Sequence, residues 1–415
     1  MNSNSNSARE VFFTFLRLGC RSFGGPVAHL GYFHAELVQQ RRWCSEQEYA
    51  ETLALAQSLP GPASSQVAFA LGLFRGGWMG SLAAWVGFTM PSALLLFGFA
   101  WGHAWFSGGI GDRALHGLQL VAVAVVAQAV LTMQRSLAST WGLRLIALAA
   151  AGATLLLPSA FTTIAIIGSA AALGSLLQSA SQTVNTPASA RTETVSAKAG
   201  WIAVSAFVIL LAVSLLSVAL LPAKAAELHI LPVFGAFYRT GALVFGGGHV
   251  VLPLLERAVV APGWVDESSF LAGYGVTQAV PGPLFTFAAY LGAVIKDPAT
   301  GAVPGSLLVR AGMSLLALVA IFMPGLLLMV AALPLWGRLR QHPRLLSALR
   351  FVNASVVGIL FAALIRPVGT TAIHTWFDGV VALAAFAALI KLNAPPWTVV
   401  VAVVLYSVAA GAIRP

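Results

Sequence analysis

Charge is scarce in this sequence of 415 residues, in which only 9% are Asp, Glu, Lys or Arg and 58% are hydrophobic. A soluble protein of this length needs more charge than that to cover its surface. Several apolar runs reach about 20 residues, the length that spans the hydrocarbon core of a bilayer. The composition therefore excludes a soluble globular protein and predicts an all-α polytopic membrane protein.

Cysteines and catalytic motifs are also scarce. The two cysteines, Cys20 and Cys44, have no second Cys or His at metal-binding spacing. The sequence contains no Walker loop, no dinucleotide fingerprint and no set of nucleophile and base. The net charge of +10 arises from few residues, so it reflects loop topology and predicts no nucleic-acid partner. We expect no metal, no cofactor and no enzymatic activity.

Two short breaks interrupt the apolar sequence. Residues 57–65 read QSLPGPASS, and residues 278–286 read QAVPGPLFT. Two prolines around a glycine end a helix, and proline suits the first turn of the next, so Pro62 and Pro283 are expected to start half-helices. In a bilayer such a break must be buried in protein or line a polar cavity, and its free N–H groups suit an anion. A plain proline kink is the alternative, but two matching copies favour a transporter site.

The second half of the chain repeats the first. Residues 15–25, FLRLGCRSFGG, align with residues 237–247, FYRTGALVFGG, at an offset of 222 (237 minus 15). The two Pro-Gly-Pro segments align at an offset of 221 (278 minus 57). We therefore expect two homologous repeats, a linker and an extra helix: 1–178 is the first repeat, 179–199 the polar linker, 200–221 the extra transmembrane helix and 230–415 the second repeat.

Loop charges indicate that the two repeats are inverted. The loop at 41–46 begins with two arginines, whereas its counterpart at 256–267 is mainly acidic. The loop at 107–112 is almost uncharged, whereas its counterpart at 336–350 contains four arginines. By the positive-inside rule, the arginine-rich loops are cytoplasmic. With broken or re-entrant helices meeting near the membrane midplane, the chain is expected to cross nine times.

Arginines and glycines at matching positions are the first candidates for a binding site. Arg17 and Arg239 lie in apolar sequence, where a guanidinium costs at least about 2.5 kcal/mol at mid-bilayer and needs a partner or a task. A planar guanidinium suits an oxyanion, although snorkelling to a headgroup is the alternative. The glycines at 24–25 and 246–248 allow either an anion nest of N–H groups or tight helix packing.

Polar side chains beside the breaks are the second group of candidates. Hydroxyl groups lie at the starts of the half-helices, a glutamine precedes each break, and a histidine follows the second glycine run. A lone histidine is more often simply hydrogen-bonded than functional. The complete set of predicted anion-binding residues is Arg17, Gly24, Gly25, Gln57, Pro60, Gly61, Pro62, Ser64, Ser65, Arg239, Gly246, Gly247, Gly248, His249, Gln278, Pro281, Gly282, Pro283 and Thr286.

The runs FLRLGCRSFGGPVAHLGYF and SLPGPASSQVAFALG, with the later copies FGGGHVVLP and QAVPGPLFTFAAYLG, resemble the chromate ion transporter family. The resemblance covers nearly the whole chain, in the long two-domain form of the family. It implies efflux of chromate across the bacterial inner membrane, with chromate or sulfate as the recognised dianion. It also assigns the glycine and Pro-Gly-Pro motifs to the site, although Gly248 replaces Pro26 in the second copy.

Two other functions stay open at this point. One is uptake of sulfate or a related oxyanion by the same architecture, and the other, less expected, is a membrane-embedded reductase. Without an ATP site, we expect transport to be driven by the membrane potential or an ion gradient, with protons as one choice of coupling ion. The partners are thus the oxyanion and the lipid bilayer, and a homodimer is left open.

Overall fold

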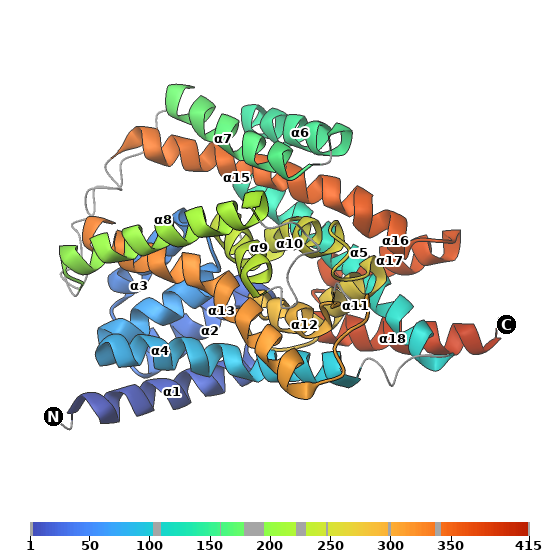
Figure 1. The fold of residues 1–415 in the computed structure, drawn as a ribbon, viewed down its shortest axis with the longest axis horizontal. Coiled ribbons are helices and arrows are strands. Elements are labelled where there is room, and N and C mark those ends of the chain that lie inside the picture. Colours follow the sequence, from blue (N-terminus) through green and yellow to red (C-terminus); the bar gives the residue numbers. More distant parts are fainter. Residues whose placement is uncertain are drawn as a thin grey trace.

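The structure is a computed structural model that describes residues 3–102, 109–157, 159–177, 195–220, 230–245, 248–297, 300–336 and 342–413. Within these ranges every regular element is a helix and no strand occurs. Most long helices run roughly along the horizontal axis of Figure 1, with the N-terminus at one end and the C-terminus at the other. The predicted all-α membrane fold is confirmed.

The first half begins with short helices that are separated by breaks. Gly76 and Gly77 have non-helical backbone, so the long helix α4 consists of a short first part and a longer second part. The elements are α1 (Ser3–Arg21), α2 (Gly25–Phe33), the π-helix η1 (His34–Gln40), α3 (Glu46–Ser58), α4 (Ala63–Gly102), α5 (Ile110–Leu137), α6 (Trp141–Leu156) and α7 (Ala160–Leu177).

The second half repeats this order of short helices after one additional helix, α8 (Ala197–Leu220). A π-helix follows the first glycine turn in the first half and a matching one, η5, follows the second. The elements are α9 (Ile230–Leu243), η4 (Gly248–Val250), α10 (Val251–Leu255), η5 (Glu256–Val260), α11 (Glu267–Thr277), η6 (Leu284–Thr286), α12 (Phe287–Val294), α13 (Leu307–Ala332), η7 (Leu333–Leu335), α15 (Pro343–Ala363), η8 (Leu364–Gly369), α16 (Thr370–Ala372), α17 (Trp376–Lys391) and α18 (Pro396–Ile413).

The apolar helices of the described residues differ in length. In the described part of the chain, five helical stretches are long and apolar enough to span a membrane: Ala63–Gly102, Ile110–Leu137, Ala197–Ser217, Leu307–Leu335 and Pro343–Ala372. Shorter apolar helices include Trp141–Leu156, Thr162–Leu177 and Pro396–Ala410. The count of nine therefore stays a prediction. Helix α8 begins at Ala197, within the predicted linker, and most of that linker lies outside the described residues.

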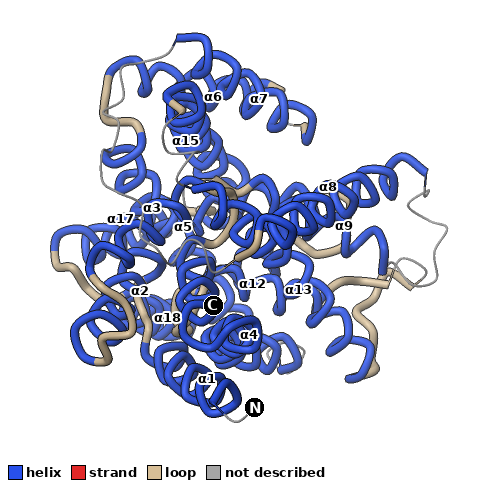
Figure 2. The backbone as a smooth tube through the Cα atoms, turned by 90° about the vertical axis from the view of Figure 1, so that its left-hand side faces the viewer, coloured by secondary structure: helices blue, strands red, loops and turns tan. Residues whose placement is uncertain are grey.

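Helix α5 forms the middle of the molecule. It is buried over most of the run from Gly117 to Val126. It contacts α11, α15, α17 and α18, and Figure 2 shows it between the α6, α7 and α15 group and the α18 and α1 group. Helix α1 packs along α4, and α9 packs along α13. Glycine allows these last two pairs to approach closely, because a Cβ on Gly19 or Gly241 would collide with backbone of the neighbouring helix.

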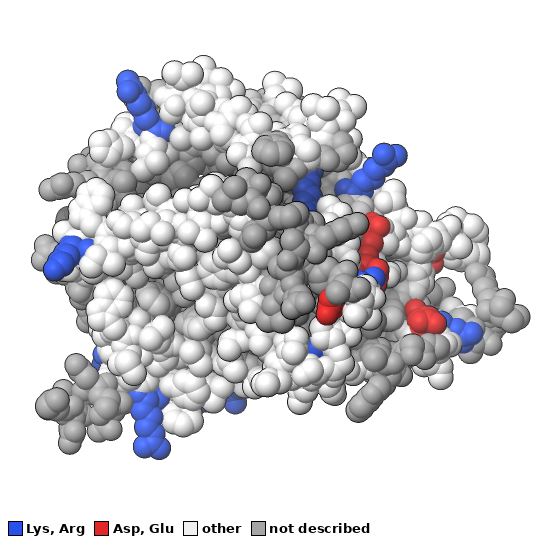
Figure 3. All heavy atoms as spheres, in the orientation of Figure 1, with Lys and Arg blue, Asp and Glu red and all other residues white. Residues whose placement is uncertain are grey.

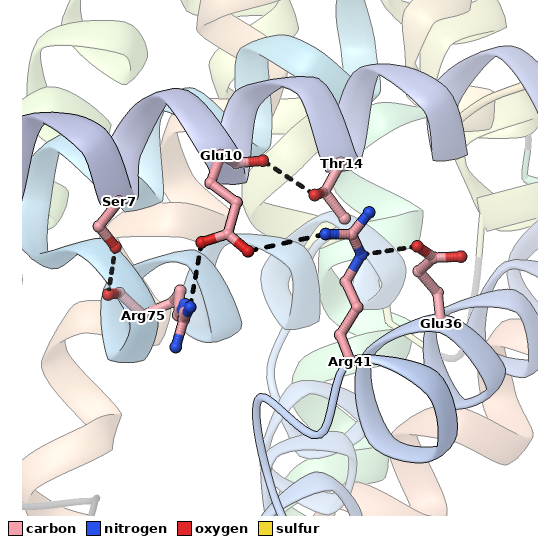
Figure 4. A network of polar contacts seen from close by, with 6 residues as sticks. All are labelled: Ser7, Glu10, Thr14, Glu36, Arg41 and Arg75. Carbon is pink, nitrogen blue, oxygen red and sulfur yellow. Dashed lines mark hydrogen bonds and ion pairs between the residues drawn. The ribbon is translucent and has the colours of Figure 1, made fainter.

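Ion pairs hold three segments together at the end of the molecule where the chain begins. Arg75 Nη2 lies 3.0 Å from Glu10 Oε2, and Arg41 Nε lies 2.7 Å from Glu36 Oε1. Arg41 Nη1 also lies 3.6 Å from Glu10 Oε1, so one network joins α1, the end of η1 and the bend in α4 (Figure 4). Exposed pairs contribute at most about 1 kcal/mol each. They join α1, the end of η1 and the bend in α4 at this end of the molecule.

The corresponding segments of the second half meet at the opposite end. Lys296 Nζ lies 2.6 Å from Asp266 Oδ1, which joins the start of α11 to the chain after α12. Thr371 of α16 donates a hydrogen bond to Glu267 Oε1. Figure 1 places α16 far from the start of α1, and Figure 3 shows the acidic side chains of that face near the α16 end.

Candidate functional site

Four interruptions of helical structure meet in the interior, and we call them together the central layer. They are the first break (59–62), the second break (278–283), the turn after α1 (22–24) and the described start of the turn after α9 (244–245). The Gly61 N–H donates to the Val244 carbonyl at 2.8 Å, and the Gly282 N–H donates to the Ser22 carbonyl at 2.9 Å. Each Pro-Gly-Pro glycine thus bonds to the turn of the other half, at matching positions of the repeat.

The glycine of each break is required by its backbone and by its neighbours. Gly61 has φ 120° and Gly282 has φ 110°, a region that L side chains rarely adopt. A Cβ on Gly61 would lie 2.8 Å from the Cα of Gly325, and a Cβ on Gly282 would lie 2.7 Å from Ser92 Oγ. The first break therefore packs closely against α13, and the second break packs closely against α4.

A new helix begins directly after each break, one residue later than expected. Pro62 and Pro283 precede the first turn instead of lying in it, because their carbonyls accept the first helical bonds. Gln66 N donates to the Pro62 carbonyl at 2.9 Å, and Thr286 N donates to the Pro283 carbonyl at 3.0 Å. The first half-helix is α-helical from Ala63, whereas the second begins with the 3-10 turn η6. The N–H groups of both first turns still face the central layer from the helix starts.

Gln66, on α4 beside the central layer, was not predicted from the sequence. Its Nε2 donates to the Pro60 carbonyl at 3.0 Å and to the Gly325 carbonyl at 2.9 Å, which fixes the first break against α13. The second half has Phe287 at the matching position, so the repeat itself did not indicate a role. The available signal was a lone amide in the apolar run after Pro-Gly-Pro.

Buried polar atoms without a hydrogen-bond partner gather in and beside the central layer. Among the described residues, these atoms include Ser22 Oγ, both ring nitrogens of His29, Ser65 Oγ, Gln66 Oε1, Thr89 Oγ1 and Gln278 Nε2. An unsatisfied buried polar group costs about 1–3 kcal/mol, so such a group of them is unfavourable in the protein alone. Ser22, His29 and Thr89 were not among the predicted site residues.

The hydroxyl and amide groups predicted at the breaks differ between the halves. Ser64 and Ser65 are buried, and Ser65 Oγ has no partner. Thr286 is equally buried, but its Oγ1 donates to the Pro283 carbonyl at 2.6 Å. Gln278 is buried with an unpaired Nε2, whereas Gln57 is exposed. Gln278 thus lies in the central layer, Ser64, Ser65 and Thr286 lie buried in the first helical turns beside it, and Gln57 is exposed.

The two glycine turns also meet. Gly24 and Gly25 have positive φ, 96° and 77°, and α2 begins at Gly25 with Pro26 in its first turn. A Cβ on Gly25 would lie 3.9 Å from Nε2 of His249, whose Nδ1 is 2.9 Å from the Tyr274 hydroxyl. The predicted Gly248 is buried at the start of η4, and the predicted Gly246 and Gly247 lie outside the described residues.

The two predicted arginines are not brought together. Arg17 is exposed on α1. Arg239 is half-buried on α9 and donates to the Ser214 carbonyl of α8. Among the described residues, no helix packs beside α1 as α8 packs beside α9, so the equivalent positions have different neighbours.

Comparison with known proteins finds one family in both halves of the chain. The sequence profile described as Chromate transporter matches residues 9–175 and 231–410. The chain belongs to the chromate transporter family. No solved structure matches. Both breaks fall inside the matched ranges, whereas α8 lies between them.

Three named relatives match over most of their length. A probable chromate transport protein of Synechococcus elongatus is 28% identical over 96% of this chain and 94% of the relative. Chromate transport proteins of Pseudomonas aeruginosa and Cupriavidus metallidurans are 28% and 26% identical, over 88% and 86% of this chain and 82% of each relative. With its apolar helices, this member of the family is a multi-pass protein of the bacterial plasma membrane.

Proposed function

We propose that the chain is a secondary transporter that exports chromate from the cytoplasm and binds the dianion in the central layer. The observation that carries this proposal is the pair of reciprocal hydrogen bonds from Gly61 and Gly282. Each bond joins the break before one half-helix to the turn of the other half, and buried polar atoms without a partner lie in and beside these segments. Membership of the family and the names of the relatives support chromate as the substrate.

The donors in this layer suit a tetrahedral oxyanion. The first-turn N–H groups of α4 carry the positive end of a helix dipole, and Ser65 Oγ and Gln278 Nε2 are donors without acceptors. A hydrogen bond to a charged group contributes about 1.5–3 kcal/mol. A bound dianion therefore offsets the cost of burying these donors. Arg17 and Arg239, predicted from the sequence to bind the anion, are left out of the proposed site because the central layer does not contain them.

We also propose that the two halves are inverted in the membrane. The swapped loop charges support this, as do the ion pairs of the first half at one end and those of the second half at the other. Labelling of Gly109→Cys and Arg340→Cys, with Cys20 and Cys44 replaced by Ser, tests it. Position 340 should react from the cytoplasm and position 109 from outside. Reaction of both from one side contradicts the inversion.

The membrane potential favours export of a dianion. Moving one charge across 100 mV corresponds to about 2.3 kcal/mol, so a dianion leaving an inside-negative cell gains about 4.6 kcal/mol. Uptake of sulfate, the alternative function, would need co-transported cations to overcome the same free energy. A reductase would need a redox group, so bound chromophore in the purified protein is the observation that would favour it.

Flux measurements test the substrate and the direction together. Inside-out vesicles should accumulate radiolabelled chromate, and an imposed potential, positive in the lumen, should increase the rate. Vesicles that carry Gly61→Ala serve as the inactive control. A pH gradient at fixed potential distinguishes proton coupling from uniport. Sulfate accumulation that depends on a cation gradient, without chromate flux, would replace this function by oxyanion uptake.

A further inference from the structure

A cluster of metal-binding side chains lies at the α16 end of the molecule, away from the central layer. It consists of His116 on α5, His374 between α16 and α17, and Asp378 in the first turn of α17. Their possible ligand atoms all lie within 4.8 Å of one another. His116 Nε2 is 3.0 Å from Asp378 Oδ1, and the imidazole rings of His116 and His374 are 5.6 Å apart at their centroids. The cluster was not expected from the sequence, which shows no metal-binding spacing.

The carboxylate of this cluster is held in place by backbone. Asp378 Oδ2 accepts hydrogen bonds from the N–H groups of His374 and Thr375, at 3.0 and 2.8 Å. Asp378 N donates in turn to Thr375 Oγ1 at 3.3 Å, so the residue also caps α17. Oδ1 therefore faces the two imidazoles with little freedom to rotate away. Such outer hydrogen bonds orient metal ligands in known sites.

A cavity of about 340 Å³ opens beside the cluster. His116, Asp378 and Thr375 line it, and so does Asp112, which lies one helical turn before His116. Two imidazoles and one carboxylate form the donor set of many zinc sites, which keep a fourth position for water. At the tetrahedral angle, two ligands at about 2.1 Å from one ion lie about 3.4 Å apart. The possible ligand atoms lie within 4.8 Å of one another, so a shift of about 1.4 Å by the exposed ring of His374 brings them to that separation.

We propose that His116, His374 and Asp378 bind a divalent transition-metal ion of the zinc type, with water in the remaining position. The ion would connect α5 to the α16–α17 corner. Gln119, three residues after His116, donates to the Ser268 carbonyl of α11 at 3.2 Å. Helix α16 also bonds to α11 through Thr371 and Glu267. Metal binding thus stabilises the corner of the molecule from which α11 leads to the second break.

Zinc binding to the purified full chain tests the site directly. With an affinity tag that lacks histidine, titration calorimetry should detect one Zn²⁺ per chain, and bound metal should be confirmed by mass spectrometry after dialysis. His374→Ala is the decisive variant, because its exposed side chain is not needed for packing. It should weaken Zn²⁺ binding by at least about tenfold. His116→Ala and Asp378→Asn should do the same, although loss of the α17 cap requires a check of their thermal stability.

His342→Ala is the matched control, because His342 is an exposed histidine that precedes α15 and lies outside the cluster. It should bind Zn²⁺ as the wild type does. Zn²⁺ should also raise the melting temperature of the wild type and of His342→Ala, but not that of His374→Ala. Absence of Zn²⁺ binding in the wild type, or equal binding in His374→Ala, overturns the proposal. Neither result depends on whether chromate is the substrate.

Discussion

The two Pro-Gly-Pro breaks have the same backbone arrangement but different side chains. In each, a glycine with φ near 110–120° donates its amide to the turn of the other half. Around this common backbone, Gln66 in the first half corresponds to Phe287 in the second, and the free hydroxyl of Ser65 corresponds to the bonded hydroxyl of Thr286. Conversely, Gln278 is buried in the second half, whereas Gln57 is exposed in the first.

This comparison indicates which parts of the duplication are structural. Backbone amides and glycine contacts hold the four interruptions together, so both halves must keep them. Side chains that only contact a ligand are free to diverge, as long as the combined site retains enough donors. We therefore expect symmetric effects from the glycines and asymmetric effects from the polar side chains.

The largest effects are expected at the break glycines. Gly61→Ala and Gly282→Ala force a side chain into a positive-φ backbone, at about 1–3 kcal/mol, and overpack the contact, at about 1–3 kcal/mol. Both should abolish chromate resistance, measured as growth and normalised to membrane abundance. Gly98→Ala, which has open space around its Cβ position, is the control and should be normal. Ser92→Ala should partly rescue Gly282→Ala but not Gly61→Ala, which meets the backbone of Gly325.

The hydroxyl groups come next and should separate the two halves. Ser65→Ala removes a donor that has no other partner, so chromate transport should weaken by about tenfold or more, as expected for loss of about 1.5–3 kcal/mol. Ser65→Asp should be worse, because its carboxylate repels the anion. Thr286→Ala should cost less, since its hydroxyl already donates to the Pro283 carbonyl. Transport rates in vesicles measure this order, and normal transport by Ser65→Asp would refute the anion site.

The two glutamines are expected to differ less in their effects on transport, and here the residue of the second half is the more sensitive one. Gln278→Leu removes a buried, unpaired amide and should reduce chromate affinity several-fold, with protein stability unchanged or improved. Gln57→Leu, at an exposed position, should leave the affinity unchanged. Apparent KM values for chromate in vesicles distinguish the two. Equal losses would indicate that the first glutamine turns inward during transport.

The smallest effect on transport is expected at Arg17. Its exposed position predicts near-normal KM and rate in Arg17→Gln. Arg239→Gln loses its hydrogen bond to the Ser214 carbonyl and should lower the melting temperature in detergent without a change in KM. Should Arg17→Gln and Arg17→Lys both lose transport in stable protein, a planar guanidinium belongs to the anion path after all.

The site could be predicted in part because some of its features are local. Pro-Gly-Pro ends a helix wherever it occurs, so the positions of both breaks and the helices on either side follow from the pattern. The exposure of Gln57 does not follow from the pattern. Neither do the two hydrogen bonds from Gln66 to the Pro60 and Gly325 carbonyls, because they depend on how α13 packs against the break. For the same reason, equivalent arginines acquired different neighbours once α8 packed against only one of them.

The sequence by itself determined the membrane environment, the helical class, the duplicated segments and the family, because these depend on composition, periodicity and local backbone chemistry. Only the tertiary structure decided that Gly61 bonds to Val244 and Gly282 to Ser22, across the two halves. It also decided that His116 and Asp378, separated by 262 residues, lie 3.0 Å apart. Such contacts join segments that are remote in the chain, and their energies depend on packing that no local pattern specifies.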